Sequence, residues 1–506
     1  MTRIQKGRGF MMRADLDKPG YGNEISGGGG GASLAIRAVS DLLEAELDGS
    51  GVARPEAAGE PGAAGVANAS TGVLGWFCTY TPEEILLAAG LDSRRIFGTF
   101  NPVRSADIYL GSNLCPYVRS CLEGAIKGRY GALDGAIMTT SCNAMCHLYN
   151  AWRRARAGST RITGSIGAAG IAGVTSGTAG RDGRTGGGFC YMLNVPRLAP
   201  QAARVQSRGR AWVVEEAEAM EDLALNYWER ELRRLIQELS SRFGAAFSDE
   251  GLYNAIRTCN ETRELLHSVY LLNKANGCYG CGRAGAEVEG TAGREGREGL
   301  AGPEARGITI AGTDLMKIVK MSMSYPKSRF NAALRRILAR LSYPYLHPQS
   351  VTPGQSTPRP GVLVAGSVCD APVIEIIEDA GARVVADDLC TGMRYFDGQV
   401  DLDEAERSGN FVRAIARRYL NKPPCARMYH ASSRFEHVYD LVREFDAKGI
   451  IFYGLKFCDP YLYDHIGLRR RFEERGIPVL LLEGDYTAGG AGQARTRVEA
   501  FVEMIS

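Results

Sequence analysis

Hydrophobic and polar positions divide the chain into regions with different periodicities. Between residues 361 and 506, short continuous apolar runs alternate with stretches in which apolar residues recur every three or four positions. Continuous runs are typical of strands buried in a parallel sheet, and the longer spacing is typical of the helices that cover it. The runs are GVLVAGS, ARVVADDL, GIIFYGL and PVLLLEGD. This alternation predicts an α/β domain over 361–506.

The N-terminal half combines the same signals and leads into a helical region. Residues 73–212 contain the runs RIFGTF, GAIMTT and FCYMLNVP together with helical patterns, and they predict another α/β domain. Residues 213–345 have mostly helical spacing, with Ser248 at an expected N-cap. The predicted fold class is therefore α/β, with two doubly wound domains of the Rossmann or flavodoxin-like type and a helical domain between them.

Three segments rich in glycine and alanine interrupt this pattern. They are 1–72, which carries one helical pattern, 155–188 and 282–306. Such compositions bury too little apolar area to offset the conformational entropy lost on ordering. We therefore expect a flexible leader and two disordered surface insertions.

Charge and hydropathy argue against several classes of partner. The 506 residues include 60 Lys and Arg against 57 Asp and Glu, interspersed along the chain, so a nucleic-acid surface is not expected. No stretch approaches the roughly 18 consecutive apolar residues of a membrane span, and the N-terminus lacks the apolar region of a secretory signal. A Walker motif is absent, so ATP hydrolysis would need another protein. We expect a cytoplasmic protein.

Three of the thirteen cysteines share one local setting. Cys115, Cys142 and Cys458 each follow a predicted strand and precede a predicted helix. Ligands gather at the carboxyl ends of parallel strands, thiolates suit iron, and a helix N-terminus favours negative charge. Three thiolates would leave one iron of a [4Fe–4S] cluster open to a substrate oxygen. On this pattern alone, buried structural thiols are the more common explanation.

Several motifs together resemble the 2-hydroxyacyl-CoA dehydratase and benzoyl-CoA reductase family. In chain order they are GWFCTYTPEEILLAAGL, SNLCPYVRS, IMTTSCNAM, NVPR, DDLCTGMRYF, GLKFCDPY and TRVEAFVEMI. The resemblance covers about residues 73–506 without the glycine-rich insertions. It implies a [4Fe–4S] cluster bound by Cys115, Cys142 and Cys458, and Glu84 as a catalytic acid–base residue.

The resemblance also implies a reaction and partners. The leading hypothesis is the iron–sulfur subunit of a dehydratase that removes water from an (R)-2-hydroxyacyl-CoA by syn-elimination through a ketyl radical anion. A separate ATP-hydrolysing iron–sulfur activator would supply one electron, which is recycled, and a paralogous subunit or a second copy would complete the dimer. The alternatives are a benzoyl-CoA-type aromatic acyl-CoA reductase subunit and a non-catalytic cluster-bearing electron-relay subunit.

Some candidate residues have both a structural and a functional interpretation. Glu84 and Glu83 also fit the acids of an ordinary helix start, and Glu83 is the better capping candidate. The hydroxyls at 139–141 could hydrogen-bond cluster sulfurs or only form a strand-end turn. Asn143 departs from the family pattern, in which an aspartate often follows the second cysteine.

The remaining cysteines and histidines are mostly expected to be structural. Cysteines expected in the core are Cys78, Cys121 and Cys146. Cys369 stands at a strand–helix turn that could face a cleft, and the CxxC of Cys278 and Cys281 fits an incidental loop pair or a metal or redox site. The segment CARMYHASSR lacks the additional cysteines of relatives with a larger double cluster, which argues against that branch. Histidines expected on the surface or in the core are His147, His430 and His465.

Overall fold

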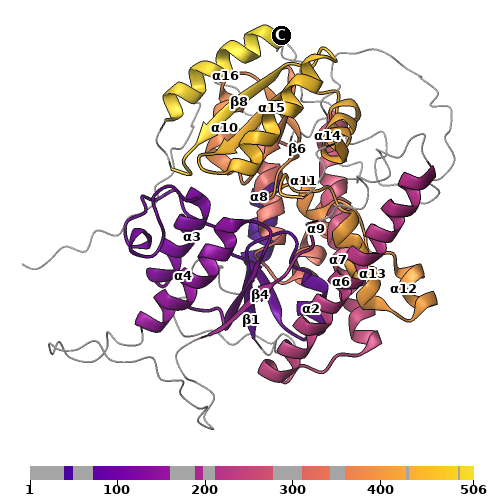
Figure 1. Ribbon diagram of the computed structural model, residues 1–506. Helices are drawn as coiled ribbons and strands as arrows, with labels where there is room; N and C mark the ends of the chain where they lie inside the picture. Colours follow the sequence, from indigo (N-terminus) through magenta and orange to yellow (C-terminus); the bar gives the residue numbers. More distant parts are fainter. Residues whose placement is uncertain are drawn as a thin grey trace, which may run out of the picture. The chain divides into compact units, whose positions relative to one another are not determined.

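Two parallel β-sheets form the frame of the structure (Figure 1). The computed structural model describes residues 39–48, 72–159, 188–197, 211–276, 310–341, 359–428, 432–487 and 490–506. The first sheet consists of β1 (Val73–Trp76), β2 (Asp92–Arg95), β3 (Gly135–Thr139) and β4 (Phe189–Leu193). The second consists of β5 (Gly361–Gly366), β6 (Arg383–Asp388), β7 (Gly449–Leu455) and β8 (Val479–Gly484). The predicted α/β fold class is confirmed.

Both sheets have the same strand order and therefore the same kind of chain reversal. The orders are β2-β1-β3-β4 and β6-β5-β7-β8, with every neighbouring pair parallel. The first strand of each sheet thus has the second strand on one side and the third on the other. In such sheets a crevice opens at the carboxyl ends of the strands where the order reverses. That crevice lies between β1 and β3 in one sheet and between β5 and β7 in the other.

Helices from the neighbouring sequence pack beside each sheet. Those that accompany the first sheet are α2 (Glu83–Ala88), α3 (Pro116–Ile126) and α4 (Asn143–Ser159), with the short 3₁₀ helix η1 (Ala106–Ile108) against α3. Those that accompany the second are α10 (Ala371–Asp379), α14 (Ser432–Glu444), α15 (Asp459–Glu473) and α16 (Ala491–Ile505). The apolar runs of β3, β5 and β7 are accordingly buried, as their pattern predicted, whereas most residues of the edge strand β8 are only half-buried or exposed.

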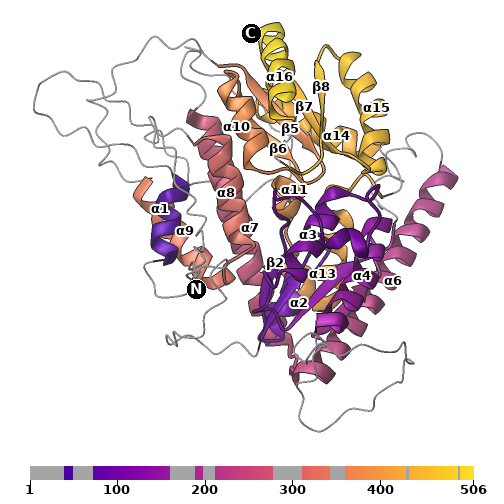
Figure 2. The same cartoon turned by 90° about the vertical axis from the view of Figure 1, so that its left-hand side faces the viewer.

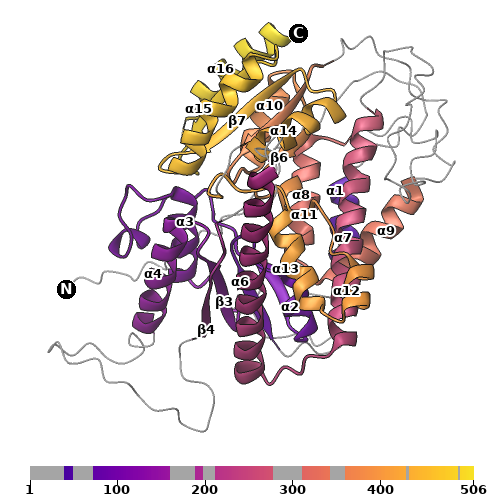
Figure 3. The ribbon, with the colours of Figure 1, turned by 45° about the vertical axis from the view of Figure 1, so that its right-hand side comes forward.

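A third group of helices combines segments from three parts of the chain. The central helices are α6 (Ala211–Phe243), α7 (Asp249–Asn276), α8 (Gly312–Ser322) and α9 (Lys327–Leu341). From the N-terminal side, α1 (Val39–Asp48) packs against α8 and α9 (Figure 2). From the C-terminal region come α11 (Met393–Phe396), α12 (Leu402–Ser408) and α13 (Phe411–Asn421), and α13 packs against α6 and α7 (Figure 3). The predicted N-cap Ser248 accepts a hydrogen bond from the backbone of Gly251 at 3.0 Å.

Aromatic contacts connect the C-terminal sheet to the N-terminal half. Tyr486, just after β8, stacks on Phe100 with ring centroids 4.6 Å apart and meets Tyr117 of α3 edge-on at 5.6 Å. All three rings belong to or pack against one hydrophobic cluster that also includes Met138 of β3 and Val364 of β5. The two sheets therefore share a core, which limits how far their carboxyl ends can move apart.

Some predicted boundaries differ from the structure. The predicted strand RIFGTF overlaps β2 only at Arg95. Residues 155–159, which were predicted to belong to a disordered insertion, are instead the last residues of α4. Most of the leader, residues 160–187 and the insertion 282–306 lie outside the described residues. None of the helices in the described part of the chain combines the length and apolarity needed to cross a bilayer.

Gly366 provides a test of how tightly the end of β5 is built. Its φ is +137°, and a Cβ there would collide with the backbone carbonyl oxygen of Tyr453 on β7. We expect Gly366→Ala to lower the free energy of unfolding by about 3 kcal/mol or more, measured by urea denaturation. Gly381→Ala is the matched control, since Gly381 also has positive φ but open space around its Cα. It should cost about 1–2 kcal/mol; equal losses in both variants would contradict the proposed steric conflict.

Candidate functional site

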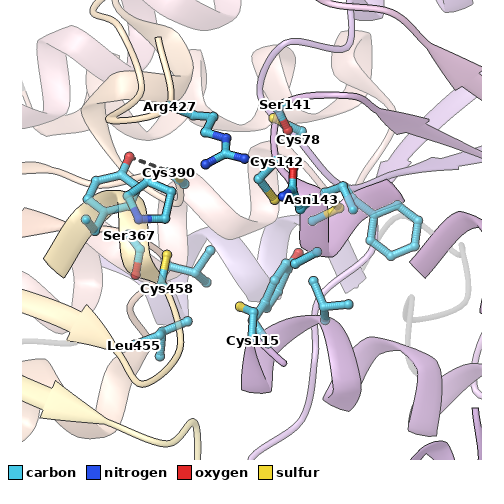
Figure 4. A pocket seen from close by; sticks show the side chains of 18 of the residues that line it. Cys78, Cys115, Ser141, Cys142, Asn143, Ser367, Cys390, Arg427, Leu455 and Cys458 are labelled. Atoms are coloured by element: carbon cyan, nitrogen blue, oxygen red, sulfur yellow. Dashed lines mark hydrogen bonds between the residues drawn. The ribbon is translucent and has the colours of Figure 1, made fainter. Parts of the chain in front are cut away.

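A cavity of about 340 Å³ lies where the carboxyl ends of the two sheets meet. Its walls come from the segments after β1, β3, β5 and β7, so the crevices of both sheets open into it (Figure 4). Six cysteines line this cavity, and all six are partly exposed: Cys78, Cys115, Cys142, Cys390, Cys425 and Cys458. We call it the sulfur pocket.

The three predicted ligands lie together in this pocket. Cys115 and Cys458 are the N-cap residues of α3 and α15, and Cys142 directly precedes α4. Figure 4 shows Cys458 on the C-terminal side of the opening and Cys115 and Cys142 on the N-terminal side. The residue before Cys458, Phe457, has a left-handed φ of +61°, an uncommon conformation for a bulky side chain. The role of the three as metal ligands stays a prediction.

The electrostatic surroundings of these three thiols are alike. Burial raises the pKa of Cys115, raises that of Cys142 to about 12, and raises that of Cys458 further still. At each sulfur, the backbone N–H three residues further on partly opposes this rise. These N–H groups belong to Val118, Met145 and Tyr461. Helix starts thus favour negative charge at each sulfur, while a bound metal would be needed to remove the proton at neutral pH.

The spacing of the pocket side chains argues against a single metal ion. Among the described residues, no three Cys, His, Asp or Glu side chains are close enough to hold one ion. A mononuclear zinc or iron site, with its ligands at about 2.3 Å from one metal, is therefore not formed by the described side chains. In a cube, by contrast, each thiolate binds a different iron atom, so its sulfurs lie further apart.

Three of the six pocket cysteines were not predicted there. Cys78 was expected in the core, but β1 ends two residues earlier and leaves it in the following turn. Cys390 follows β6 and Cys425 follows α13, so their settings resemble those of the predicted ligands. The lack of further cysteines in CARMYHASSR therefore does not limit the sulfur content of the pocket, because the others come from distant segments.

A buried polar network contacts two of these additional sulfurs. The hydroxyl of Tyr461 lies 3.6 Å from Cys425 Sγ and 3.7 Å from Cys390 Sγ. Nη1 of Arg394 donates to the same hydroxyl and lies 3.4 Å from Cys390 Sγ, while its Nε donates to Asp388 at 2.8 Å. Cys390 and Cys425 are thus held in place by hydrogen-bonded side chains.

Comparison with known proteins identifies the family. Over residues 78–163 and 183–505 the chain matches the family described as 2-hydroxyglutaryl-CoA dehydratase, D-component. The chain belongs to this family. The matched ranges contain all six cysteines of the sulfur pocket.

Relatives within the family catalyse two kinds of reaction. The chain is 21% identical over 436 residues to the (R)-phenyllactyl-CoA dehydratase beta subunit of Clostridium sporogenes, covering 85% of this chain and 91% of the relative. It is 20% identical over 442 residues to the beta subunit of lactoyl-CoA dehydratase from Anaerotignum propionicum, covering 87% and 93%. It is 21% identical over 447 residues to a benzoyl-CoA reductase subunit of Thauera aromatica, covering 87% and 92%. These relatives indicate a subunit of the 2-hydroxyacyl-CoA dehydratase or benzoyl-CoA reductase type.

The hydroxyls beside Cys142 are mostly engaged in the strand-end turn. Thr139 donates to Ser141 at 2.9 Å, and Thr140 accepts from the backbone of Val195 at 2.9 Å. Of the three, Ser141 lines the pocket. The hydroxyls of both threonines therefore stabilise the turn at the end of β3, whereas Ser141 also lines the cavity.

Asn143 links the two sides of the pocket. Its Oδ1 accepts a hydrogen bond from Arg427 Nη2 at 2.7 Å, and both residues line the cavity (Figure 4). Asn143 thus fixes the position of an arginine in the pocket lining.

The other candidates divide between the core and the undescribed segments. Cys121 is buried as predicted, while Cys146 is only half-buried and does not line the pocket. Cys369 is fully buried with its Sγ 3.7 Å from the carbonyl oxygen of Asp370, so it does not face the cleft. His147 lines the pocket and His465 is buried. The residues that lie outside the described part are Cys278, Cys281 and His430.

Glu84 lies in a buried ion pair rather than in the pocket lining. Its side chain is 0% exposed, pairs with Arg263 of α7 and accepts a hydrogen bond from Tyr419 of α13 at 3.0 Å. Burial opposes its ionisation, but Arg263 and Arg418 outweigh burial and hold its pKa below the usual range. A general acid needs the opposite shift. These are the surroundings of a structural ion pair, and the catalytic role of Glu84 stays a prediction.

Glu83 makes a second such connection from the same turn of α2. It lies 3.1 Å from Nζ of Lys327 on α9 and accepts hydrogen bonds at 2.6 Å from both Ser93 and Tyr395. Both acids at the start of α2 therefore serve tertiary contacts, and the simple capping interpretation of Glu83 is too narrow.

Glu84→Gln tests the structural contribution of the Arg263 pair. Because the change leaves Arg263 buried without a counter-charge, we expect the free energy of unfolding at pH 7 to fall by about 3–5 kcal/mol. The lowered pKa of Glu84 stabilises the wild type above the unfolded-state pKa of about 4.3, and this stabilisation is lost as pH falls through the folded-state pKa. Urea unfolding at several pH values should therefore show the difference between wild type and variant shrinking in acid.

Glu474→Gln is the matched control for this substitution. Glu474 pairs with Arg470 on the surface of α15, where its side chain is 57% exposed, so its loss should change stability by less than about 0.5 kcal/mol. A Glu84→Gln variant as stable as this control would show that the buried pair is not needed for folding.

Proposed function

We propose that the chain is the iron–sulfur subunit of a 2-hydroxyacyl-CoA dehydratase that removes water from an (R)-2-hydroxyacyl-CoA thioester. One observation carries the proposal: Cys115, Cys142 and Cys458, from three distant segments and each at a helix start, line one cavity at the meeting point of two chain reversals. The dehydratase subunits among the relatives support the reaction class.

The donors in the cavity fit a [4Fe–4S] cluster. Thiolates are soft ligands that suit iron–sulfur clusters, and among the described residues no three ligand side chains form a site for a single ion. Cys115, Cys142 and Cys458 would hold it and leave one iron open. When bound, the cluster would supply a Lewis-acidic site and pass one electron to the thioester carbonyl. The ketyl radical anion of the substrate would then expel the α-hydroxyl as hydroxide, lose a β-proton and return the electron, so that the net loss is one water.

Residues of the chain would bind and orient the thioester. Arg427 lines the cavity, and its Nε has no hydrogen-bond partner among the described residues. With Nη2 held by Asn143, the guanidinium is fixed at the cavity, where its positive charge would attract a carbonyl or phosphate oxygen of an acyl-CoA. Apolar lining residues such as Phe77 and Leu455 would limit water at the reacting carbons.

The proposed reaction needs two partners. The relatives are subunits of multi-subunit enzymes, so we propose a paralogous subunit, or a second copy of the chain, as the dimer partner. Because no Walker motif occurs in the sequence, the electron would come from a separate ATP-hydrolysing iron–sulfur activator.

A second candidate function is favoured by the number of sulfurs in the pocket. Six cysteines are twice as many as one open cube requires, and Cys390 and Cys425 share the hydroxyl of Tyr461. Six thiolates could hold a larger iron–sulfur centre. Such a centre suits a subunit that stores or relays electrons, as in an acyl-CoA reductase, better than a dehydratase that recycles one electron.

Single cysteine substitutions separate these two candidates. In both, Cys142→Ala should remove most of the iron from anaerobically purified protein, while the fold survives because the deletion costs only about 1–2 kcal/mol. For one cube, wild type should hold about four iron atoms, and Cys390→Ala and Cys425→Ala should keep them. For the larger centre, wild type should hold clearly more iron, and both variants should lose it.

Iron and acid-labile sulfide per chain are the measurements. Cys259→Ala is the matched control, because Cys259 is buried in α7 away from the pocket and should leave both values unchanged. Full iron content in Cys142→Ala would refute the proposed ligand set. Wild type without iron would refute both candidates.

Turnover then distinguishes dehydratase from reductase. The protein would be assayed with its partner subunit, the activator, ATP, a reductant and a panel of (R)-2-hydroxyacyl-CoA and aromatic acyl-CoA thioesters. A dehydratase forms enoyl-CoA with only catalytic amounts of electrons, whereas a reductase consumes electrons in proportion to product. Electron consumption in proportion to product would overturn the dehydratase proposal.

A further inference from the structure

A buried lysine without a carboxylate partner lies behind the sulfur pocket. Lys422 is 2% exposed, and its Nζ donates to the backbone carbonyl of Thr79, the residue after Cys78, at 3.0 Å. The ammonium group also lies over the ring of Tyr80, 4.9 Å from its centroid. Within the described residues no Asp or Glu forms an ion pair with it. The ammonium group therefore lies next to the turn after β1 that carries Cys78, and no carboxylate among the described residues balances its charge.

A buried arginine on the same side of the pocket has the same feature. Arg95 is 5% exposed and lines the cavity, and its Nη1 donates to the backbone carbonyl of Cys390. Its guanidinium lies over Trp76 and Phe97, at 5.3 and 5.5 Å from the ring centroids, and its Nε has no hydrogen-bond partner among the described residues. In the described structure no carboxylate pairs with it either.

Most other buried cations of the described structure have a carboxylate partner. Their carboxylate pairs are Arg263 with Glu84, Lys327 with Glu83, Arg394 with Asp388, and Arg434 with Asp464. Arg418 instead donates to three backbone carbonyl oxygens. Asp459 is the acid of the pocket lining, and it is solvent-exposed. One buried cation in the pocket lining, Arg95, and one behind it, Lys422, thus lack a carboxylate partner among the described residues.

An unpaired buried cation is costly unless an anion balances it. Burial and the neighbouring Arg418 lower the pKa of Lys422 well below its usual value, so the ammonium form is disfavoured in the chain alone. Both cations donate to backbone carbonyl oxygens beside pocket cysteines: Lys422 to that of Thr79, which follows Cys78, and Arg95 to that of Cys390. Thiolates that bind metal in this pocket would carry the opposite charge. The missing negative charge is thus expected in the cavity itself.

We propose that Lys422 and Arg95 are positioning residues that compensate the negative charge of a thiolate-ligated metal group in the sulfur pocket. The proposal rests on the proposed function, in which the pocket holds an iron–sulfur centre. Reduction makes such a centre more negative by one charge, so nearby fixed cations favour the reduced state. The two residues therefore raise the reduction potential of the centre without touching the metal.

The test compares three lysine variants of the full-length chain after anaerobic reconstitution. Lys422→Met removes the charge, Lys422→Arg keeps it, and Lys317→Met removes the exposed lysine of α8 as the matched control. Iron per chain and the reduction midpoint, from a potentiometric titration followed by electron paramagnetic resonance, are measured for each. Lys422→Met should shift the reduction equilibrium about tenfold toward the oxidised form, about 59 mV for one electron. The other two variants should match wild type.

Metal-free protein supplies an independent measurement. Because the charge of Lys422 is uncompensated without a bound group, metal-free Lys422→Met should unfold at the same or a higher temperature than metal-free wild type. A variant that holds metal poorly while its metal-free form is fully stable would thus report on charge rather than folding.

The outcomes distinguish this inference from the proposed function. An unchanged midpoint in Lys422→Met with full iron content would overturn the inference and leave the iron–sulfur proposal standing. Loss of iron in Lys422→Met but not in Lys422→Arg would also support the need for a positive charge. Loss of iron in both would assign Lys422 to packing and overturn the inference. Wild type without iron would overturn both proposals.

Discussion

The site depends on one constraint of the fold: the topological switch points of both parallel sheets face the same cavity. Each parallel sheet has a crevice at the carboxyl ends of its central strands, between β1 and β3 and between β5 and β7. A shared core and the contact of Tyr486 with Phe100 and Tyr117 keep the two crevices together. Side chains that are far apart in the chain therefore reach one space, and six of them are cysteines. A single crevice would present about half of this set.

Buried charges in the molecule fall into two groups with different consequences. Glu83 and Glu84 of α2 pair with Lys327 and Arg263, and these pairs connect the first sheet to the helices α9 and α7. Removing one partner of such a buried pair is strongly destabilising. The two pairs therefore help to fix α2 against α9 and α7. The cations beside the sulfur pocket have no such partners among the described residues, which leaves their charge for the cavity. The same residue types thus stabilise the fold in one place and, in our proposal, support the site in another.

The same frame would serve a dehydratase or a reductase subunit, because it determines where cysteines gather and not how many of them would bind metal. Cys115, Cys142 and Cys458 stand at helix starts with matching electrostatic surroundings. Cys390 and Cys425 stand on the other side, in contact with Tyr461 and the Arg394–Asp388 pair. Whether electrons are recycled or consumed would then depend on the size and potential of the centre.

The sequence by itself determined the fold class and the three cysteines at strand ends, because both follow from local patterns: continuous apolar runs such as GIIFYGL and cysteines directly before helices. Only the tertiary structure decided that Cys78, Cys390 and Cys425 line the same cavity as those three cysteines. Their positions depend on the strand order and on the packing of segments that are far apart in the sequence. The tertiary structure also decided that Glu84 faces Arg263, 179 positions away in the chain, and not the pocket. Local sequence reports the periodicity of an element, whereas the partner of a buried charge depends on which distant element packs against it.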